Sequence, residues 1–320
     1  MLRLSLALPA ALTLALGAAA TAAADAGLAP VTPESPNANA IRQTYWVILI
    51  ITGVIFVLVE GALLLFIIRF RRGRRSYTQE GPQLHGATKL ETASTIVPVL
   101  ILAGIAAFVF VKLPTIKNVP PANAAGGSLK ITVEAHQYYW QFHYPQNQVA
   151  FTRMVVPVDR VVELAVVSPD VIHSWWAPAL GGKIDAIPGR TNHTWFKAET
   201  LGHYVVRCAE LCGLEHAHMT GWVDVVTPAA YSKFLADHTG AENKVVGKEV
   251  FDGVCATCHG ALGEGDYGPA LAGNGTIADS KALEDLLRNG KNKMPAVGKT
   301  WDQQTVDSAT AYLKERFGGG

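Results

Sequence analysis

Two long apolar stretches near the N-terminus restrict what this chain can fold into. Residues 46–68 are interrupted only by Glu60, and residues 93–111 contain a proline but no charged residue. Each stretch is long enough to cross the ~30 Å hydrocarbon core of a bilayer as a helix. The sequence therefore predicts a transmembrane helix hairpin over residues 44–115, followed by a large domain outside the membrane.

The segment between these stretches, residues 69–92, sets the orientation of the hairpin. Its basic residues are Arg69, Arg71, Arg72, Arg74, Arg75 and Lys89. Positively charged loops stay in the cytoplasm, so the rest of the chain lies on the opposite side of the membrane. We expect a multi-pass protein of the bacterial inner membrane whose soluble part is in the periplasm.

The N-terminus has the layout of a secretory signal peptide. Residues 1–24 begin with Arg3, continue through an apolar run and end in small residues. A retained transmembrane helix is the alternative, but Pro9 breaks the run and the run is short for a bilayer. Removal of the signal peptide leaves residues 25–43 as a periplasmic segment before the hairpin.

The charge balance excludes one class of partner. Lys and Arg number 27 against 26 Asp and Glu, which leaves a net charge of +1. No global field attracts a polyanion to such a chain, so we expect no nucleic-acid partner.

The periplasmic part divides by its residue patterns. Residues 116–128 form a Pro, Gly and Ala linker, and residues 129–227 consist of short β-branched and aromatic runs that predict a β-sandwich or small barrel. A polar connector, residues 228–246, leads to a helical module at 247–320 that is too small for a self-sufficient core without a large cofactor. The expected fold class is therefore multidomain, with a helix hairpin, an all-β domain and an all-α domain.

Two of the four cysteines lie in the helical module. Cys255, Cys258 and His259 form C-x-x-C-H, the attachment sequence for c-type haem. A thioredoxin-like dithiol is the alternative, but it requires a βαβ context and leaves the histidine unexplained. Met294 is the only methionine of the module and the candidate sixth iron ligand, which predicts an electron-carrying haem.

The other two cysteines lie among soft ligands in the β-domain. Residues 208–219 read C-A-E-L-C-G-L-E-H-A-H-M, with Cys208, Cys212, His216 and Met219 as ligand candidates. This set favours copper, although zinc could use both thiolates, His216 and another histidine. A single blue-copper centre uses one cysteine, so two bridging thiolates suggest two copper ions.

The pattern C-x-E-x-C-G-x-x-H-x-x-M resembles the binuclear copper (CuA) motif of cytochrome c oxidase subunit II. Residues 173–176 (HSWW) and 185–190 (DAIPGR) resemble the first-histidine strand and the following turn of that family. The helix hairpin and the aromatic run at 136–140 (HQYYW) match the family's order. The resemblance covers residues from about 40 to 227, and the haem module extends it to the end, as in caa-type oxidases.

The resemblance implies a cupredoxin domain and a set of ligands for two coppers. Cys208 and Cys212 would bridge the ions, and His173 and His216 would each bind one. Met219 would be a weak axial ligand on one copper, and the backbone carbonyl of Glu210 that on the other. The Glu210 side chain would point toward a magnesium ion at the boundary with subunit I.

The function that follows from the resemblance is electron entry into a proton-pumping oxidase. Electrons from cytochrome c or a bc-type complex would pass through haem c and CuA to the haem of subunit I, where oxygen is reduced to water. Subunits I and III would be its membrane partners, and the assembly would be a cytochrome-c oxidase. Oxygen reduction itself would occur in subunit I, since this chain lacks a second histidine cluster for it.

Three alternatives were weighed against this function. A nitrous oxide or nitric oxide reductase component has a similar copper domain, but the hairpin before the β-domain and the haem after it argue against the former. A membrane-tethered copper carrier has no use for a covalent haem. A quinol oxidase subunit II lacks the copper ligands.

Two further residues receive roles from the resemblance. Glu91, at the start of the second membrane helix, resembles the family's proton-entry glutamate, although an acid at a helix N-terminus needs no function. Tyr138 stands where relatives that accept electrons from a separate cytochrome c usually have tryptophan. We expect Tyr138 on the docking surface of the attached haem, with that haem as the obligatory donor to copper, although a packing role would also explain a tyrosine there.

Overall fold

The structure is a computed structural model that describes residues 30–71, 85–121, 127–240 and 242–318. The signal peptide expected at 1–24 lies outside the described residues. The chain divides into two compact units, of which one is Asn39–Asn118 and the other combines Val119–Gly320 with the described residues before Asn39.

The first unit consists of two long apolar helices. They are α2 (Pro36–Arg69), whose first residues belong to the other unit, and α3 (Thr88–Lys117). At 1.5 Å per residue, helices of 34 and 30 residues extend about 51 and 45 Å, more than the ~30 Å of a hydrocarbon core. Most of their apolar side chains are exposed, which is the state expected of helices that face lipid.

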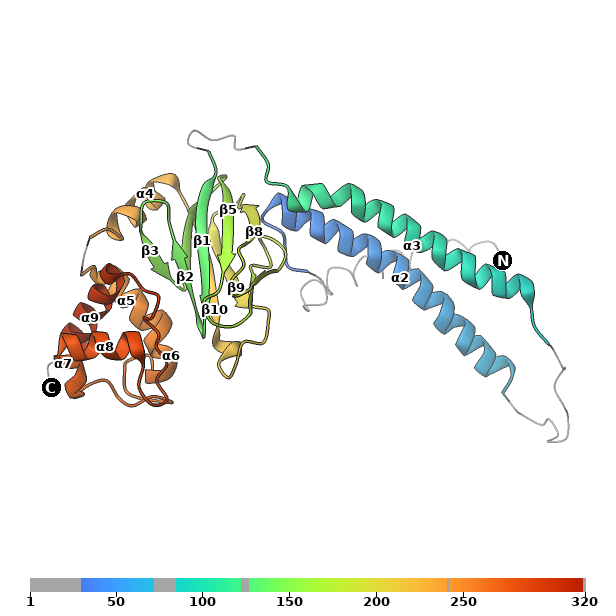
Figure 1. Ribbon diagram of the computed structural model, residues 1–320. Coiled ribbons are helices and arrows are strands. Elements are labelled where there is room, and N and C mark those ends of the chain that lie inside the picture. Colours follow the sequence, from blue (N-terminus) through green and yellow to red (C-terminus); the bar gives the residue numbers. More distant parts are fainter. Residues whose placement is uncertain (1–29, 72–84, 122–126, 241, 319–320) are drawn as a thin grey trace, which may run out of the picture. The chain divides into compact units, whose positions relative to one another are not determined.

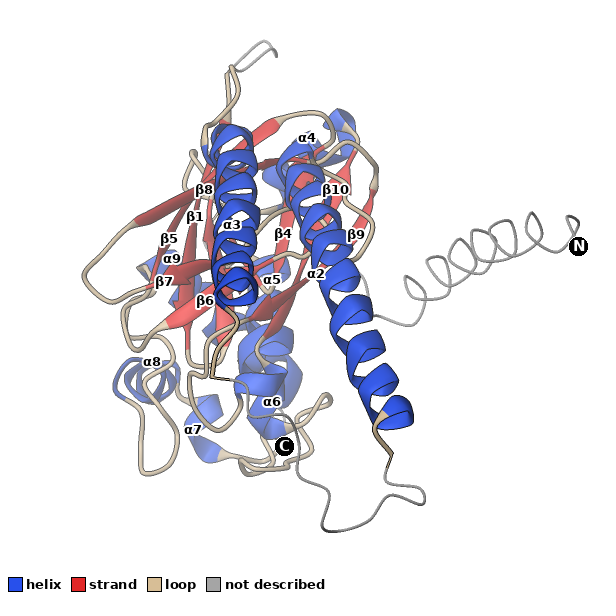
Figure 2. Ribbon diagram, turned by 90° about the vertical axis from the view of Figure 1, so that its right-hand side faces the viewer, coloured by secondary structure: helices blue, strands red, loops and turns tan. Residues whose placement is uncertain are grey.

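The β-domain consists of ten strands in two sheets (Figure 2). The first sheet has the order β3-β2-β1-β5-β8 and the second has the order β4-β10-β9-β6-β7. The strands are β1 (Leu129–His136), β2 (Tyr139–His143), β3 (Val149–Phe151), β4 (Arg153–Pro157), β5 (Val161–Val167), β6 (His173–Trp176), β7 (Ile184–Ala186), β8 (Asn192–Lys197), β9 (Gly202–Cys208) and β10 (Thr220–Val226).

Side chains that point alternately to the two faces of each strand form the core between the sheets. In β1, Ile131 and Val133 are buried there, and in the antiparallel neighbour β2, Trp140 and Phe142 point to the same core. Tyr139, one residue before Trp140, therefore faces the outside of the first sheet. This side of the sheet is important because the helical module covers it.

The C-terminal helices follow the β-domain along the chain. They are α4 (Pro228–Asp237), α5 (Lys244–Val250), the π-helix η2 (Phe251–Cys255), α6 (Ala256–His259), α7 (Gly275–Ala278), α8 (Ser280–Asn289) and α9 (Gln303–Phe317). From α5 onward they enclose a second apolar core with Phe251, Leu287 and Trp301 near its centre. The strong amphipathic pattern of α8 explains its packing, since only Leu283 and Leu287 of that helix are buried.

The second core is completed by the β-domain. Tyr139, Val149 and Phe151, from strands β2 and β3, belong to the same buried cluster as the helices. Figure 1 shows these helices, in orange and red, beside the edge formed by β2 and β3. The helical module is thus packed on the β-domain, and the connector is not its only attachment.

A buried polar junction supports this packing. The backbone N–H of Phe151 donates to Glu249 Oε2 at 3.1 Å, and Glu249 Oε1 lies 2.9 Å from His238 Nε2. The other ring nitrogen of His238 lies 2.8 Å from the carbonyl oxygen of Phe234. Burial lowers the pKa of His238, but its contact with Glu249 outweighs burial and raises it. Glu249 of α5 therefore bonds both to strand β3 and to a buried histidine of the connector.

Candidate functional site

The copper-ligand candidates converge at one end of the second sheet. Cys208 is the last residue of β9, and Met219 directly precedes β10, so the loop between these antiparallel neighbours carries the cysteine pair. His173 begins β6, the other neighbour of β9. Pairing of Trp175 with Cys208 brings the start of β6 to the loop. The sheet topology thus assembles residues separated by up to 46 positions.

The sulfur atoms of Cys208 and Cys212 lie 3.9 Å apart and are buried. His173 Nδ1 is 3.9 Å from Cys208 Sγ, and His216 Nδ1 is 3.5 Å from Cys212 Sγ. His173, Cys208 and Cys212 form the one group of three or more candidate metal ligands found within the described ranges. Each thiol therefore has an imidazole nitrogen beside it.

Two weaker donors border the same sulfurs. Met219 Sδ lies 3.8 Å from Cys212 Sγ, and the carbonyl oxygen of Glu210 lies 3.2 Å from Cys208 Sγ. The Met219 side chain is only 1% exposed, so its thioether is committed to the interior of the site. Thiolates, imidazoles and a thioether in one buried cluster are the donors that copper prefers, and the residues fit the ion that the sequence predicts.

Charge explains why this cluster needs a cation. Burial raises the pKa of Cys208, but hydrogen bonds with His173 and nearby backbone groups outweigh it and lower the pKa to about 6. Burial and the charge of Cys208 raise the pKa of Cys212 to about 12. Each thiolate thus disfavours the other, and bound copper ions would stabilise both.

Asp170 fixes the ring of His173. Its Oδ1 lies 2.9 Å from His173 Nε2, and its Oδ2 accepts a hydrogen bond of 2.7 Å from the backbone N–H of Gln137. Burial raises the pKa of Asp170, but these hydrogen bonds outweigh it and lower the pKa to about 2. The ionised carboxylate thus holds Nε2 and leaves Nδ1 directed at Cys208, as an outer partner of a metal-binding histidine does.

The haem-attachment candidates lie where the π-helix passes into α6. Cys255 ends η2, and Cys258 and His259 lie in the four-residue helix α6. Neither cysteine forms a disulfide. His259 Nδ1 lies 2.7 Å from the carbonyl oxygen of Pro269, which can only accept, so Nδ1 carries the proton and Nε2 keeps its lone pair for iron.

A glycine allows this arrangement of the imidazole. The backbone of Gly268 approaches the His259 ring so closely that a Cβ atom there would lie 2.8 Å from the ring carbon Cε1. Met294 is partly buried and packs against the same apolar cluster as Cys255. Two thiols, an oriented imidazole and a thioether around one cluster fit a covalent haem with two axial protein ligands.

The remaining predicted residues lie in different places. The Tyr138 hydroxyl accepts a hydrogen bond of 3.1 Å from the backbone N–H of Leu214, which is on the copper loop. In the helix unit, Glu91 Oε1 accepts one of 3.1 Å from the backbone N–H of Ala87, at the start of α3. Tyr138 thus borders the copper loop, whereas the hydrogen bond of the Glu91 side chain is a local one at a helix terminus.

Sequence reasoning missed Asp170 and Gln137. The amide nitrogen of Gln137 donates to the carbonyl oxygen of Cys212 at 2.6 Å, so Gln137 touches both the copper loop and Asp170. A signal existed for Asp170, because an acid three residues before a metal-binding histidine is a common orienting partner. Gln137 had none, since its contacts depend on how the loops fold together.

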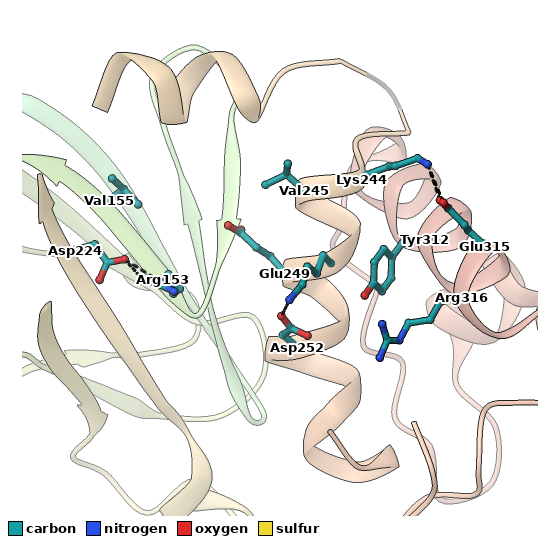
Figure 3. Close-up of a pocket in the computed structure, with 11 residues that line it drawn as sticks. Arg153, Val155, Asp224, Lys244, Val245, Glu249, Asp252, Tyr312, Glu315 and Arg316 are labelled. Atoms are coloured by element: carbon teal, nitrogen blue, oxygen red, sulfur yellow. Dashed lines mark hydrogen bonds and ion pairs between the residues drawn. The ribbon is translucent and has the colours of Figure 1, made fainter. Parts of the chain in front are cut away.

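A separate groove lies between strands β4 and β10 and helices α5 and α9 (Figure 3). Its volume is about 740 Å³. Its charged side chains are largely paired with each other, as in Arg153 with Asp224 and Lys248 with Asp252. It contains none of the copper or haem ligand candidates, so we assign no function to it.

Comparison with known families divides the chain into three matches. Residues 25–111 match the transmembrane domain of cytochrome c oxidase subunit II, and residues 149–226 match the periplasmic domain of the same subunit. Residues 242–313 match subunit III of cbb3-type cytochrome c oxidase, a cytochrome c family. The matches follow the order of hairpin, β-domain and helical module.

A relative decides the family. The cytochrome c oxidase subunit 2 of Cereibacter sphaeroides is 32% identical over 252 residues, which cover 64% of this chain and 79% of that protein. The chain belongs to the cytochrome c oxidase subunit II family. The subunit 2 of Alkalihalophilus pseudofirmus is 29% identical over 317 residues and covers 90% of each chain. The solved periplasmic domain of subunit II from Bradyrhizobium japonicum is 36% identical, with a TM-score of 0.35, and covers 38% of this chain and 96% of that one.

Several expectations are thereby confirmed. The family, the three-part fold class and the place of the chain in a cytochrome c oxidase complex are those predicted from the sequence. The family implies copper in the β-domain, and the cytochrome domain implies haem. The chain is a membrane protein with its β-domain on the extracellular side.

The contact between Asp170 and His173 gives a first prediction. An Asp170→Ala variant should bind copper roughly 10- to 100-fold more weakly, because the His173 ring loses the group that orients it. Copper titration against a competing chelator, followed by visible absorption, measures this. Asp237→Ala removes an exposed, ion-paired carboxylate of α4 and should leave the affinity unchanged. Equal affinities for the Asp170 variant and the wild type would show that the carboxylate does not hold the ring for copper.

Proposed function

We propose that this chain is the electron-entry subunit of a respiratory cytochrome c oxidase that pumps protons. Electrons from cytochrome c would pass through its own haem c and a binuclear CuA centre to the haem of subunit I, where oxygen is reduced to water. The observation that carries this proposal is the buried pair of Cys208 and Cys212, with an imidazole nitrogen beside each sulfur. A C-x-x-C-H haem sequence lies in the same compact unit.

The binuclear form follows from the number of donors. Cys208 and Cys212 would bridge two ions, with His173 on one and His216 on the other. Met219 and the carbonyl oxygen of Glu210 would be the weak axial ligands. Because His173 and Cys208 lie on strands β6 and β9, and both ends of the loop with the other donors are anchored by β9 and β10, the site would change little between oxidation states. Small reorganisation favours fast electron transfer. The exposed side chain of Glu210 is free to reach a magnesium ion at the boundary with subunit I.

The haem module would supply the electrons. Cys255 and Cys258 would hold the porphyrin by thioether bonds, and His259 and Met294 would bind the iron. Ligation by histidine and methionine raises the reduction potential and closes the iron to oxygen, so this haem would carry electrons only. Burial is the main cause of the raised pKa of Cys258, and the negative charge of Glu215, on the copper loop, adds to it. This interaction supports proximity of the two redox sites.

The helix hairpin would contact the other membrane subunits of the oxidase. Subunits I and III would surround the hairpin in the bacterial inner membrane, with both redox domains in the periplasm. The external donor would be cytochrome c or a bc-type complex. Glu91 would lie at the cytoplasmic mouth of a proton route into subunit I, and Tyr138 would lie on the docking surface between haem and copper, where its contact with Leu214 supports such a role.

The copper assignment predicts a separable loss of metal. The wild-type chain should contain about two copper ions and one covalent haem, as the ligand counts require. Cys212→Ser should lose the copper absorption and keep the haem, because the two sites share no ligand. Metal analysis with visible and near-infrared spectra measures both. One zinc in place of copper in the wild type would refute the central assignment.

The order of electron carriers predicts the effect of removing the haem module. An assembled oxidase whose chain lacks residues 240–320 should oxidise soluble cytochrome c poorly, because external electrons would enter through the module. Copper content is checked in parallel, since the deletion uncovers Tyr139 and Phe151. Near-normal oxidation by a complex that retains its copper would show that a direct route exists and that the module is an accessory.

The proton-entry role of Glu91 has its own test. Glu91→Gln in the assembled enzyme should slow turnover and the reduction of the oxygen site, because the amide cannot carry a proton. The substitution keeps an acceptor for the N–H of Ala87, so α3 should remain intact. Unchanged turnover would leave Glu91 with its local role at the helix terminus.

A further inference from the structure

Tyr139 is the centre of the contact between the two redox domains. It begins β2, its side chain points away from the core of the β-domain, and the residue is only 2% exposed because the helical module covers it. Its ring packs against Phe151, with centroids 6.0 Å apart, and at a steep angle against Trp301, with centroids 6.3 Å apart. The tyrosine is thus a residue of one domain buried in the other.

The hydroxyl group of Tyr139 makes two hydrogen bonds, both to the haem module. It donates to the carbonyl oxygen of Val297 at 2.8 Å and accepts from Trp301 Nε1 at 3.0 Å. Val297 lies three residues after Met294, the proposed iron ligand. The hydroxyl therefore connects strand β2 to the segment from Met294 to Val297, called the methionine loop below, and to Trp301, which lies just before α9.

The haem-attachment sequence is also close to the ring of Tyr139. Cys255 packs against the same buried cluster to which Tyr139 belongs. Nearby, Gly253 has no side chain where Thr152 of the β-domain approaches, and a Cβ atom there would collide with the threonine. The two domains thus meet at backbone distance beside the haem-attachment sequence.

The same strand leads directly to the copper site. Gln137 lies two residues before Tyr139, and its backbone N–H and side-chain amide bond to Asp170 and to the carbonyl oxygen of Cys212. Asp170 in turn contacts His173 Nε2. A short covalent segment with hydrogen bonds at both ends therefore spans from the methionine loop to two copper-ligand candidates.

We propose that Tyr139 is a positioning residue that holds the haem module in the geometry required for electron transfer to copper. This inference rests on the proposed function of the two redox centres. One electron would leave the ferrous haem, which is oxidised, and enter the oxidised copper pair, which is reduced. No bond breaks and no proton moves in this step, so the hydroxyl acts through geometry alone. Tunnelling depends steeply on distance and contact, which is why a single fixed contact matters.

The test is Tyr139→Phe in the full chain within the assembled oxidase. A photoexcited ruthenium complex reduces the haem, and absorption changes report haem oxidation and copper reduction. We expect the internal transfer to slow several-fold, because tunnelling between the two centres falls steeply as their separation grows. The static haem and copper spectra should not change, since Tyr139 is a ligand of neither. Trp301→Phe removes the indole N–H that donates to the Tyr139 hydroxyl, and it should slow the transfer as well.

Tyr144→Phe is the matched control. Tyr144 is equally buried in the β-domain, and its hydroxyl also makes two hydrogen bonds, to the backbone carbonyl and N–H of Val155. Its ring packs against Tyr231 and Phe234 of α4, and both hydrogen bonds of its hydroxyl stay within the β-domain. Loss of a buried hydroxyl as such would affect both variants, whereas a positioning role would affect only Tyr139→Phe.

A second readout does not depend on electron transfer. The N–H of Phe151 bonds to Glu249 across the same contact, so its hydrogen exchange reports whether the domains stay together. Exchange at residues 149–152 should be faster in Tyr139→Phe than in Tyr144→Phe. Unchanged transfer rates in Tyr139→Phe would overturn the positioning role. Absence of haem-to-copper transfer in the wild type would instead refute the proposed function, so the two failures can be told apart.

Discussion

Two buried thiols 3.9 Å apart cannot both ionise in this protein unless positive charge lies beside them. Burial and the charge of Cys208 raise the pKa of Cys212, while the contact with His173 outweighs burial and lowers the pKa of Cys208. Copper resolves this conflict, because it supplies the missing charge and accepts the imidazole and thioether donors around the pair. The local fold meets this requirement, since β6 carries His173, β9 carries Cys208, and the loop between β9 and β10 carries the other donors.

The alternation of β2 connects this site to the second redox domain. Trp140 and Phe142 anchor the strand in the core of the sandwich, so Tyr139 must face the opposite side, where the helical module covers it. The segment before the strand carries Gln137 to the copper loop. Residues 137–142 therefore contribute to the core of the β-domain, to the contact with the helical module and to the support of the copper ligands.

The sequence was sufficient for the chemistry of the sites and for the class of each domain. The C-x-x-C-H motif and the spacing of Cys208, Cys212, His216 and Met219 carry their ligands within a few residues, and the hydropathy pattern revealed the helix hairpin. The contacts around these ligands could not be predicted in the same way. Gln137 and Tyr139 act through partners 75 and 162 residues away, which only the folded chain brings together, whereas Asp170 lies three residues from His173. The His238–Glu249 pair is similar, because its burial depends on the packing of the connector against α5.

The claim that most of this account depends on is that both cysteines bridge a pair of copper ions. Electron paramagnetic resonance of the oxidised wild-type protein tests it directly, because an unpaired electron shared equally by two copper nuclei gives a different hyperfine pattern from one held by a single nucleus. A pair of copper ions bridged by both cysteines should give the pattern of two equivalent nuclei, together with a copper content of about two per chain. The pattern of a single copper nucleus would contradict it.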